Sequence, residues 1–441
     1  MVPQVESAAP APSLASEWRL TAREVSAGNF QYQLQNRLTQ APVRYEYVKT
    51  GWVKTWWGGY PVVNLVVETH FRLVPQTGCR AYPEITENVR GDRNRLKGSA
   101  TAPVRGYVDA HTHITSWEFM GGRVMHGGAF HRWGVPYALD DSRRTHGLNG
   151  SLDLIGNIFV YGNPAHTYDT RGWPDFPWWP NHVQLTHGGY YWKWMERAWL
   201  SGLRLTVTHL VENEVLCNVQ STINPVGWIG ANSCNEMDSI RLQARRLREL
   251  QDYIDAQYGG PGKGFFRIVT SAQQARQVIA DGKLAVVMSV EASETLNCGE
   301  RDYCTVATID AGLTELYNLG IRGLFPAHKF DNQFSGAVLE DGFINIGEAL
   351  STGHYYESER CDEHTQGKAM SSGFPVIGDL PLIGSLLGQI GATPSYEPHH
   401  DHCNVRGLTE KGVYLVNRMI DLNMIIDLDH LSEKAARQVM D

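Results

Sequence analysis

The stretch Gly106-Tyr-Val-Asp-Ala-His111-Thr-His113 is a short apolar run that ends in two histidines. Four later runs have the same pattern, at residues 203–209, 284–291, 321–328 and 424–430, and they end in His209, Glu291, His328 and His430. Parallel strands that are buried on both faces have such apolar sequences. Barrels of alternating strands and helices carry their reactive groups at the C-terminal ends of the strands. The five runs therefore predict an α/β fold, a TIM-type (β/α)8 barrel with a metal site at its mouth.

Helical sequences separate these runs. Residues 236–258 have apolar side chains at helical spacing, and Ser271, Thr409 and Ser432 are placed to cap three further helices. A closed barrel of this type has eight strands, and only five are visible here. We therefore expect a barrel that is truncated after strand five, close to Asp441.

Composition divides the chain into three parts. Residues 1–25 are rich in Ala, Pro and Ser and predict a linker or a disordered segment. Residues 26–100 contain strand-like runs and turn signals such as Gly58-Gly59, which predict a small β-rich accessory unit. Residues 101–441 would form the barrel, with long insertions at about 114–184 and 331–406.

Charge and hydropathy limit the expected partners. The formal net charge of −8 argues against nucleic acid, because a polyanion binder needs a surplus of basic residues. No apolar run is long enough to predict a membrane span. The first 16 residues have neither the basic start nor the apolar core of a secretory leader, so the compartment stays open. The expected partner is a small molecule.

The seven cysteines include no C-x-x-C pair, which argues against a zinc ribbon. Cys298 and Cys304 are close enough in sequence to form a disulfide, as are Cys217 and Cys234. Buried free thiols are the alternative, and the sequence does not decide between the two. Disulfides would indicate an oxidising compartment, such as the exterior of the cell.

The candidate metal ligands follow from the strand ends. His111 and His113 are two residues apart on a strand, so their imidazoles point to the same face and form half of a divalent metal site. The carboxylate of Glu291 ends an apolar strand, where a charge is costly without a partner, and it has two oxygens with which to bridge two metals. The same argument makes His430 a ligand. The alternative for all four is that they are polar or salt-bridged strand ends. His209 and His328 fit a ligand or a core residue equally well.

Three stretches carry a family resemblance. Residues 269–283 read Val-Thr-Ser-Ala-Gln-Gln-Ala-Arg-Gln-Val-Ile-Ala-Asp-Gly-Lys and precede Val-Glu291-Ala-Ser. Residues 316–328 read Leu-Tyr-Asn-Leu-Gly-Ile-Arg-Gly-Leu-Phe-Pro-Ala-His, and Gly407-Leu-Thr-Glu-Lys-Gly precedes Ile426-Asp-Leu-Asp-His430-Leu-Ser. Together they resemble the membrane (renal) dipeptidases of the metal-dependent amidohydrolase superfamily. The resemblance covers residues 236–441, and more weakly extends back to residue 106.

The resemblance implies a role for each candidate. Glu291 would bridge two zinc ions, His430 would ligate one of them, and His111 would ligate the other. His328 would bind no metal and would act as the catalytic residue that contacts the substrate or the tetrahedral intermediate. The family has H-x-D on the first strand, whereas this chain has His113 at the second position, which leaves the number and identity of the metals open.

The family also has a histidine on strand six and a catalytic aspartate on strand eight. Both would lie beyond Asp441, so we expect residues 1–441 to bind at most one metal firmly and to hydrolyse dipeptides poorly. The complete protein would hold two zinc ions.

The sequence favours a zinc-dependent hydrolase that cleaves a dipeptide or a similar small amide by attack of a metal-bound hydroxide. A second interpretation keeps the fold with different amidohydrolase chemistry, as in a deaminase, lactonase or esterase. A third is a non-catalytic truncated barrel that acts as a binding module. A substrate panel separates the first two, and metal content together with turnover separates both from the third.

Two features of the insertions are open to more than one interpretation. Trp173, Trp178 and Trp179 could line a substrate site, but a local core for a long loop is favoured. The run His399-His400-Asp401-His402 could bind a metal, but a solvated loop is favoured.

Overall fold

The computed structural model describes residues 18–26, 29–36, 38–55, 58–71, 83–86, 88, 96–225, 227–363, 365–373, 393–398 and 401–441. The chain divides into two compact units, Met1–Tyr82 and Pro83–Asp441. This boundary lies inside the segment that composition assigned to the β-rich unit. The reason is that Glu84 belongs to the second unit, where its carboxylate accepts hydrogen bonds from Trp192 and Tyr253.

The first unit contains two antiparallel hairpins. Its strands are β1 (Trp18–Ser26), β2 (Asn29–Asn36), β3 (Tyr45–Thr55) and β4 (Gly58–Glu68), paired β1 with β2 and β3 with β4. The prediction of a linker over residues 1–25 is wrong from Trp18 onward. Trp18, Leu20 and Ala22 alternate with polar residues, which is the period of a strand, and the nearby Ala/Pro/Ser-rich composition obscured it.

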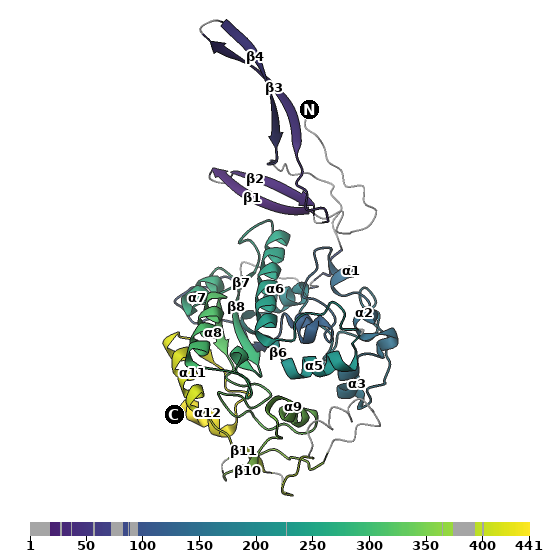
Figure 1. Ribbon diagram of the computed structural model, residues 1–441, viewed down its shortest axis with the longest axis vertical. Helices are drawn as coiled ribbons and strands as arrows, with labels where there is room; N and C mark the ends of the chain where they lie inside the picture. The colour runs from purple at the N-terminus through teal and green to yellow at the C-terminus, as the bar shows by residue number, and fades with distance from the viewer. Residues whose placement is uncertain are drawn as a thin grey trace. The chain divides into compact units, whose positions relative to one another are not determined.

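A curled parallel sheet, half of a barrel, organises the second unit (Figure 1). Its order is β12-β9-β8-β6-β5, and β7 pairs with the start of β8. The strands are β5 (Tyr107–Thr112), β6 (Leu203–Glu212), β7 (Phe266–Ile268), β8 (Leu284–Ala292), β9 (Ile321–Leu324) and β12 (Ile425–Ile426). The mixed α/β class and the parallel sheet agree with the sequence.

Three details of the sheet differ from expectation. The sequence did not predict β7, because three residues are too few to show a strand pattern. Strand β6 continues past His209 to Glu212, since the residues after His209 still pair with β8. Strands β9 and β12 end before His328 and His430, which lie in the loops that follow. These two histidines are therefore positioned by loops and not by strands.

Helices cover the sheet, and the one at residues 214–223 was not predicted from the sequence. They are α4 (Trp192–Leu200), α5 (Glu214–Ile223), α6 (Glu236–Gln257), α7 (Ala272–Ala280), α8 (Val306–Asn318), α11 (Glu410–Asp421) and α12 (Glu433–Met440). Helix α6 packs against β6 and β7, α7 against β8, and α8 against β9 (Figure 1). The predicted inward face of α6, which includes Ile240 and Leu247, is fully buried.

The predicted helix caps are confirmed. The hydroxyls of Ser271, Thr409 and Ser432 each accept a hydrogen bond from a backbone N–H in the first turn of α7, α11 and α12. In a reciprocal capping box, the side chain of Gln274 would accept from the backbone N–H of the cap residue, Ser271. Its side-chain oxygen instead accepts from the backbone N–H of Thr270, at 2.9 Å.

Both insertions contain short regular elements. The first has η2 (Ser116–Glu118), η3 (Met120–Gly122), α1 (Val135–Ala138), α2 (Arg143–His146), η4 (Leu148–Gly150) and α3 (Leu154–Tyr161). The second has α9 (Phe343–Thr352), β10 (Ser358–Arg360) and β11 (His402–Asn404). Trp179 is fully buried in the hydrophobic core, and Trp173 packs against that core. Trp178 is exposed. The core that holds Trp179 also contains residues of α6 and β8, so the first insertion packs into the main core of the unit and not into a separate local core.

The histidine run of the second insertion is only partly described. His399 and His400 lie outside the described residues. His402 is buried, and its two ring nitrogens each lie 3.2 Å from a carbonyl oxygen, one of Lys368 and one of Glu397. A solvated loop was therefore the wrong expectation for His402, because backbone carbonyls surround its ring.

Three disulfides cross-link the second unit. Two are the expected pairs, Cys217–Cys234 and Cys298–Cys304. The third joins Cys361 to Cys403 across 42 residues, a spacing from which sequence alone does not predict a pair. Cys79 lies outside the described residues.

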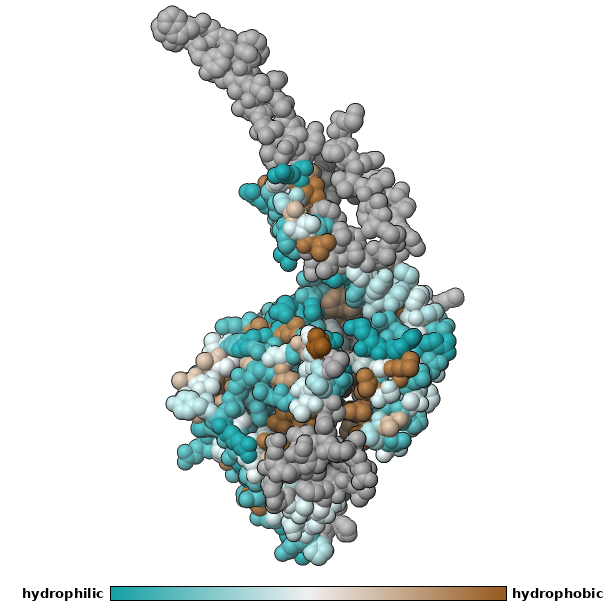
Figure 2. All heavy atoms as spheres, turned by 45° about the vertical axis from the view of Figure 1, so that its right-hand side comes forward, coloured by the Kyte–Doolittle hydropathy of each residue, from teal (hydrophilic) through white to brown (hydrophobic). Residues whose placement is uncertain are grey.

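The described helices include none that is both long and apolar enough to cross a bilayer. On the face drawn in Figure 2, hydrophilic residues occupy most of the described surface and separate the apolar patches.

Candidate metal centre

Four imidazoles converge on the carboxylate of Glu291, which β8 positions. One carboxylate oxygen, Oε2, lies 3.2 Å from His111 Nε2 and 3.3 Å from His113 Nε2. The other, Oε1, lies 2.8 Å from His328 Nε2 and 3.1 Å from His430 Nε2. The structure thus brings together all five residues that the sequence singled out for the site. They form two groups of three possible ligands that share Glu291, and the ligand atoms of each group lie within 4.8 Å of one another.

His111 lies in β5 and His113 directly follows that strand. Their Nε2 atoms are 3.2 Å apart, so both rings point to the same side, as the spacing of two residues on a strand predicts. Two ring nitrogens at this distance cannot both carry a proton toward each other. The arrangement presents at least one nitrogen lone pair to the space in front of Glu291.

The protonation of His113 shows why a cation fits this space. Its Nδ1 lies 3.1 Å from the carbonyl oxygen of His209, and a carbonyl can only accept, so Nδ1 carries the proton. Burial lowers the pKa of His113, which keeps the ring neutral and leaves Nε2 unprotonated. That lone pair then faces Glu291 Oε2, a buried atom that accepts no hydrogen bond of good geometry from the described residues. A cation between these two acceptors would offset their repulsion.

Glu291 is ionised despite its burial. Burial would raise the pKa of this carboxyl group, but the adjacent imidazoles of His111, His328 and His430 outweigh burial and hold the pKa far below its usual value. Burial lowers the pKa of His328 to about 4. The contact with Glu291 raises the pKa of His111. The centre combines one carboxylate with four imidazoles, and these are donor types that zinc and similar divalent metals prefer.

His209 contributes to the candidate centre through contacts with His111 and His113, and its side chain is not directed at Glu291. Its ring packs against the ring of His111 at 4.3 Å between centroids, and its Nε2 lies 3.2 Å from the carbonyl oxygen of Ala110. Its own carbonyl orients His113. This is the kind of contact that fixes the tautomer of a metal-binding histidine.

Asp427 and Asp429 flank His430 in the sequence, but neither hydrogen-bonds the buried Nδ1 of its ring. The carboxylate of Asp427 accepts instead from the backbone N–H of Asp429, at 3.3 Å. The Nδ1 atoms of His430 and His328 are buried and have no hydrogen-bond partner among the described residues. The sequence places the two aspartates beside His430, but the turn after β12 directs them elsewhere.

Ser293, two residues after Glu291, joins three strand ends. Its hydroxyl oxygen accepts from the side-chain amide of Asn213 at 2.9 Å and from the backbone N–H of Lys329 at 3.1 Å. Its carbonyl accepts from the side-chain amide of Asn332 at 3.0 Å. Since Lys329 directly follows His328, these bonds fix the His328 loop against the end of β8.

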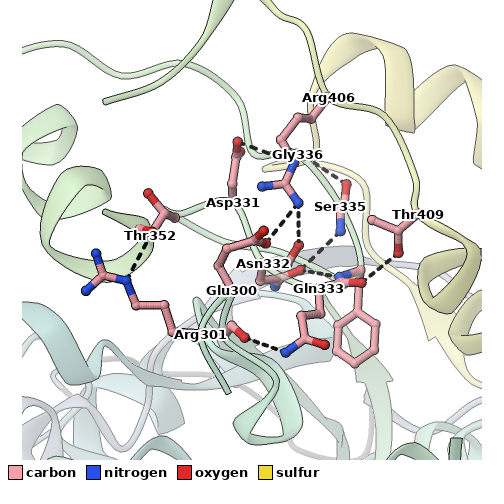
Figure 3. A network of polar contacts seen from close by, with 12 residues as sticks. Glu300, Arg301, Asp331, Asn332, Gln333, Ser335, Gly336, Thr352, Arg406 and Thr409 are labelled. Atoms are coloured by element: carbon pink, nitrogen blue, oxygen red, sulfur yellow. Dashed lines mark hydrogen bonds and ion pairs between the residues drawn. The ribbon is translucent and has the colours of Figure 1, made fainter. Parts of the chain in front are cut away.

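A polar network extends from Asn332 into the second insertion (Figure 3). The guanidinium of Arg406 binds the carboxylate of Glu300 at 2.9 Å and the carbonyl of Asn332 at 3.2 Å. The side-chain oxygen of Asn332 accepts from the backbone of Ser335 at 3.1 Å. Sequence reasoning missed Asn213, Ser293 and this network. Asn213 could have been predicted as a helix cap, because it is the N-cap of α5, but that role does not indicate its contact with Ser293.

No protein-family model matches the chain, and no curated protein matches it. Two solved structures are similar over part of the chain. One is dipeptidase AC, a metallopeptidase of family M19, with 17% sequence identity, a TM-score of 0.24, and coverage of 54% of this chain and 47% of that one. The other is a metallopeptidase from Rhodobacter sphaeroides with a phosphinate mimic of the dipeptide L-Ala-D-Ala, with 18% identity, a TM-score of 0.21, and coverage of 54% and 41%. The matched region spans less than half of either structure.

Proposed function

We propose that this chain carries the metal centre of a metal-dependent hydrolase. The observation that supports this is the position of Glu291, whose two oxygens are each approached by two imidazole nitrogens. A buried carboxylate in this setting suits a ligand that bridges two cations. We propose zinc, because imidazole nitrogen and carboxylate oxygen are its usual non-sulfur ligands.

The two positions differ in their protein ligands. His111, His113 and Glu291 Oε2 supply three donors to the first, which we expect to bind its ion firmly. Glu291 Oε1 and His430 supply two donors to the second, which we expect to bind more weakly.

A divalent metal held by these residues would supply a bound water with a pKa near 7 and a Lewis acid for a carbonyl group. The residues of the chain then bind and orient the substrate. We propose that His328 contacts the carbonyl oxygen of the substrate and donates a hydrogen bond where negative charge develops. His209 orients His113 through its carbonyl, and Ser293 holds the loop that carries His328.

A dipeptide or a similar small amide is the proposed substrate. This part of the proposal rests on the three sequence stretches that resemble the membrane dipeptidases. The presence of His113 where that family has aspartate favours a second candidate, a deaminase, lactonase or esterase of the same superfamily.

The test combines metal analysis with a substrate panel. Purified protein should contain zinc or a similar divalent ion above trace, and zinc-loaded protein should hydrolyse dipeptides faster than esters, lactones or aminopyrimidines. Faster turnover of one of the other classes would select the second candidate. Protein that binds no metal and turns over none of these substrates would reject the hydrolase and favour a binding module.

A further inference from the structure

A second group of possible metal ligands lies inside the first insertion, apart from Glu291. It consists of His146 at the end of α2, Asp153 at the N-cap of α3, and His187 shortly before α4. One ligand atom from each lies within 4.8 Å of those from the other two. All three side chains are buried, with exposed fractions of 1%, 3% and 5%.

His187 is the most unusual member of this group. Neither of its ring nitrogens has a hydrogen-bond partner among the described residues. The ring stacks on Trp179 at 4.8 Å and meets the ring of His146 edge-on at 4.6 Å. Burial lowers the pKa of His187 well below its usual value, so the imidazole is neutral and keeps a free lone pair. A buried polar ring without a partner requires an explanation.

His146 directs its Nδ1 at Tyr168 and at Asp153. Its Nε2 lies 2.8 Å from the carbonyl oxygen of Val124, so Nε2 carries the proton of the neutral ring and Nδ1 can only accept. The hydroxyl of Tyr168 lies 2.8 Å from that Nδ1 and 2.9 Å from Asp153 Oδ2. Asp153 Oδ2 also accepts from the hydroxyl of Thr186, so both acceptors have a donor when Tyr168 donates to His146 Nδ1.

Asp153 has one oxygen already committed and one turned toward the two rings. Its Oδ1 accepts from the backbone N–H of Gly156 at 3.0 Å and caps α3. Its Oδ2 accepts from the hydroxyl of Thr186 at 2.7 Å and lies 3.7 Å from His146 Nδ1. A separation of 3.7 Å is close to that of two ligands on one tetrahedral ion with metal–ligand bonds of about 2.1 Å.

We propose that His146 Nδ1, Asp153 Oδ2 and a ring nitrogen of His187 bind a divalent transition-metal ion such as zinc. An ion at this point would provide the partner that the ring nitrogens of His187 lack among the described residues. Two imidazoles and a carboxylate are a common ligand set for such ions. The hydroxyl of Tyr168 or a water molecule would complete the coordination.

Burial of all three ligands indicates that this metal is structural. The ligands come from α2, from the start of α3 and from the segment that leads into α4, so one ion would join three separate segments of the insertion. The arrangement does not depend on Glu291, and the inference does not rest on the proposed hydrolase activity.

The experiment counts metal in the full 441-residue chain. The Glu291 centre is first disabled by the double substitution Glu291→Ala/His111→Ala. We expect this variant to retain about one equivalent of zinc by elemental analysis. Loading it with cobalt(II) should give the visible absorption of a tetrahedral nitrogen and oxygen site. Adding His187→Phe, which keeps an aromatic ring against Trp179 but removes the ligand, should abolish both signals.

The control is His182→Ala, which removes an exposed histidine of the same insertion and should leave the metal in place. Retention of full zinc and cobalt signals after His187→Phe would overturn the proposal, as would an equal loss with His182→Ala. If the His187→Phe protein does not fold, the cobalt spectrum of the double variant still decides, because a spectrum without the tetrahedral bands rejects the site. Failure of the Glu291 centre would appear separately, as an unchanged metal content on going from the original chain to the double variant.

Discussion

The side-chain amide of Asn213 donates a 2.9 Å hydrogen bond to the hydroxyl of Ser293, and this bond joins the ends of β6 and β8 beside the metal centre. The same hydroxyl accepts from the backbone N–H of Lys329, directly after His328. Ser293 is fully buried, so water cannot replace it as a partner. The positions of Glu291 and His328 relative to each other therefore depend on the hydrogen bonds of Ser293.

Substitution Ser293→Ala should destabilise the protein without removing metal. It leaves the amide of Asn213 and the N–H of Lys329 without this acceptor, which costs about 1–3 kcal/mol per buried group. Urea unfolding should show the loss, and elemental analysis should show unchanged metal. Ser201→Ala, at an exposed serine, is the control and should change stability by less than about 0.5 kcal/mol. Equal stability of the two variants would show that the Ser293 contacts do not hold the loop.

Substitution Glu291→Gln should lower bound metal at the candidate centre. The amide has one acceptor oxygen and no charge, so it cannot serve two cations. Glu212→Gln is a matched control, because Glu212 is equally buried on the neighbouring strand β6 but bonds to the backbone of Met120 and to Ser239. Elemental analysis should show loss in the first variant only. Equal metal in both would remove the bridging role from Glu291.

Substitution His328→Asn should separate catalysis from metal binding. If His328 contacts the substrate, turnover should fall by about 10²–10³, the effect of removing one donor to a developing oxyanion. Metal content should remain unchanged. Steady-state kinetics and elemental analysis on the same preparation measure both quantities. Loss of one metal ion would instead make His328 a ligand, which its distance from Glu291 Oε1 also permits.

The stability of the chain should depend on pH through Glu212. Burial raises the pKa of this carboxyl group to about 7, above its ordinary value of 4.5. The folded state therefore holds the proton more tightly than the unfolded state, so this group favours folding at low pH. Its contribution declines as the pH rises from about 4.5 to 7, by at most about 3 kcal/mol, and is constant above that.

Urea unfolding from pH 5 to pH 8 in the presence of a chelator measures this effect. The free energy of unfolding of the original chain, relative to Glu212→Gln, should decrease with rising pH, because glutamine does not titrate. A difference that stays constant across this range would show that Glu212 has an ordinary pKa.

Thiol titration should find one free cysteine per chain. The sequence has seven cysteines, and six of them form three disulfides. Protein denatured without reductant should therefore react at one thiol, and reduced protein at seven. Seven thiols in air-exposed protein before reduction would contradict all three pairs and would indicate an intracellular setting.

Local sequence patterns were enough to predict much of the second unit. Helix α6, the caps at Ser271 and Thr409 and most strands were predictable because each signal depends on residues a few positions apart. Strand β7 was missed because its three residues have no period of their own. The strand β1 was missed because composition was averaged over a segment in which only the last residues alternate.

The sequence by itself determined which side chains are available at the centre and that His111 and His113 share a face, because alternation along a strand is a local property. Only the tertiary structure decided that all four imidazoles meet the two oxygens of one carboxylate. It also decided that the carbonyl of His209 selects the tautomer of His113.

The same division applies to the contacts between distant segments. The pairing of Cys361 with Cys403 and the meeting of His146, Asp153 and His187 were decided by the tertiary structure alone. The physical reason is that these groups are far apart along the chain and approach one another only when the sheet curls and the loops pack against it. No local pattern of residues encodes such a distance.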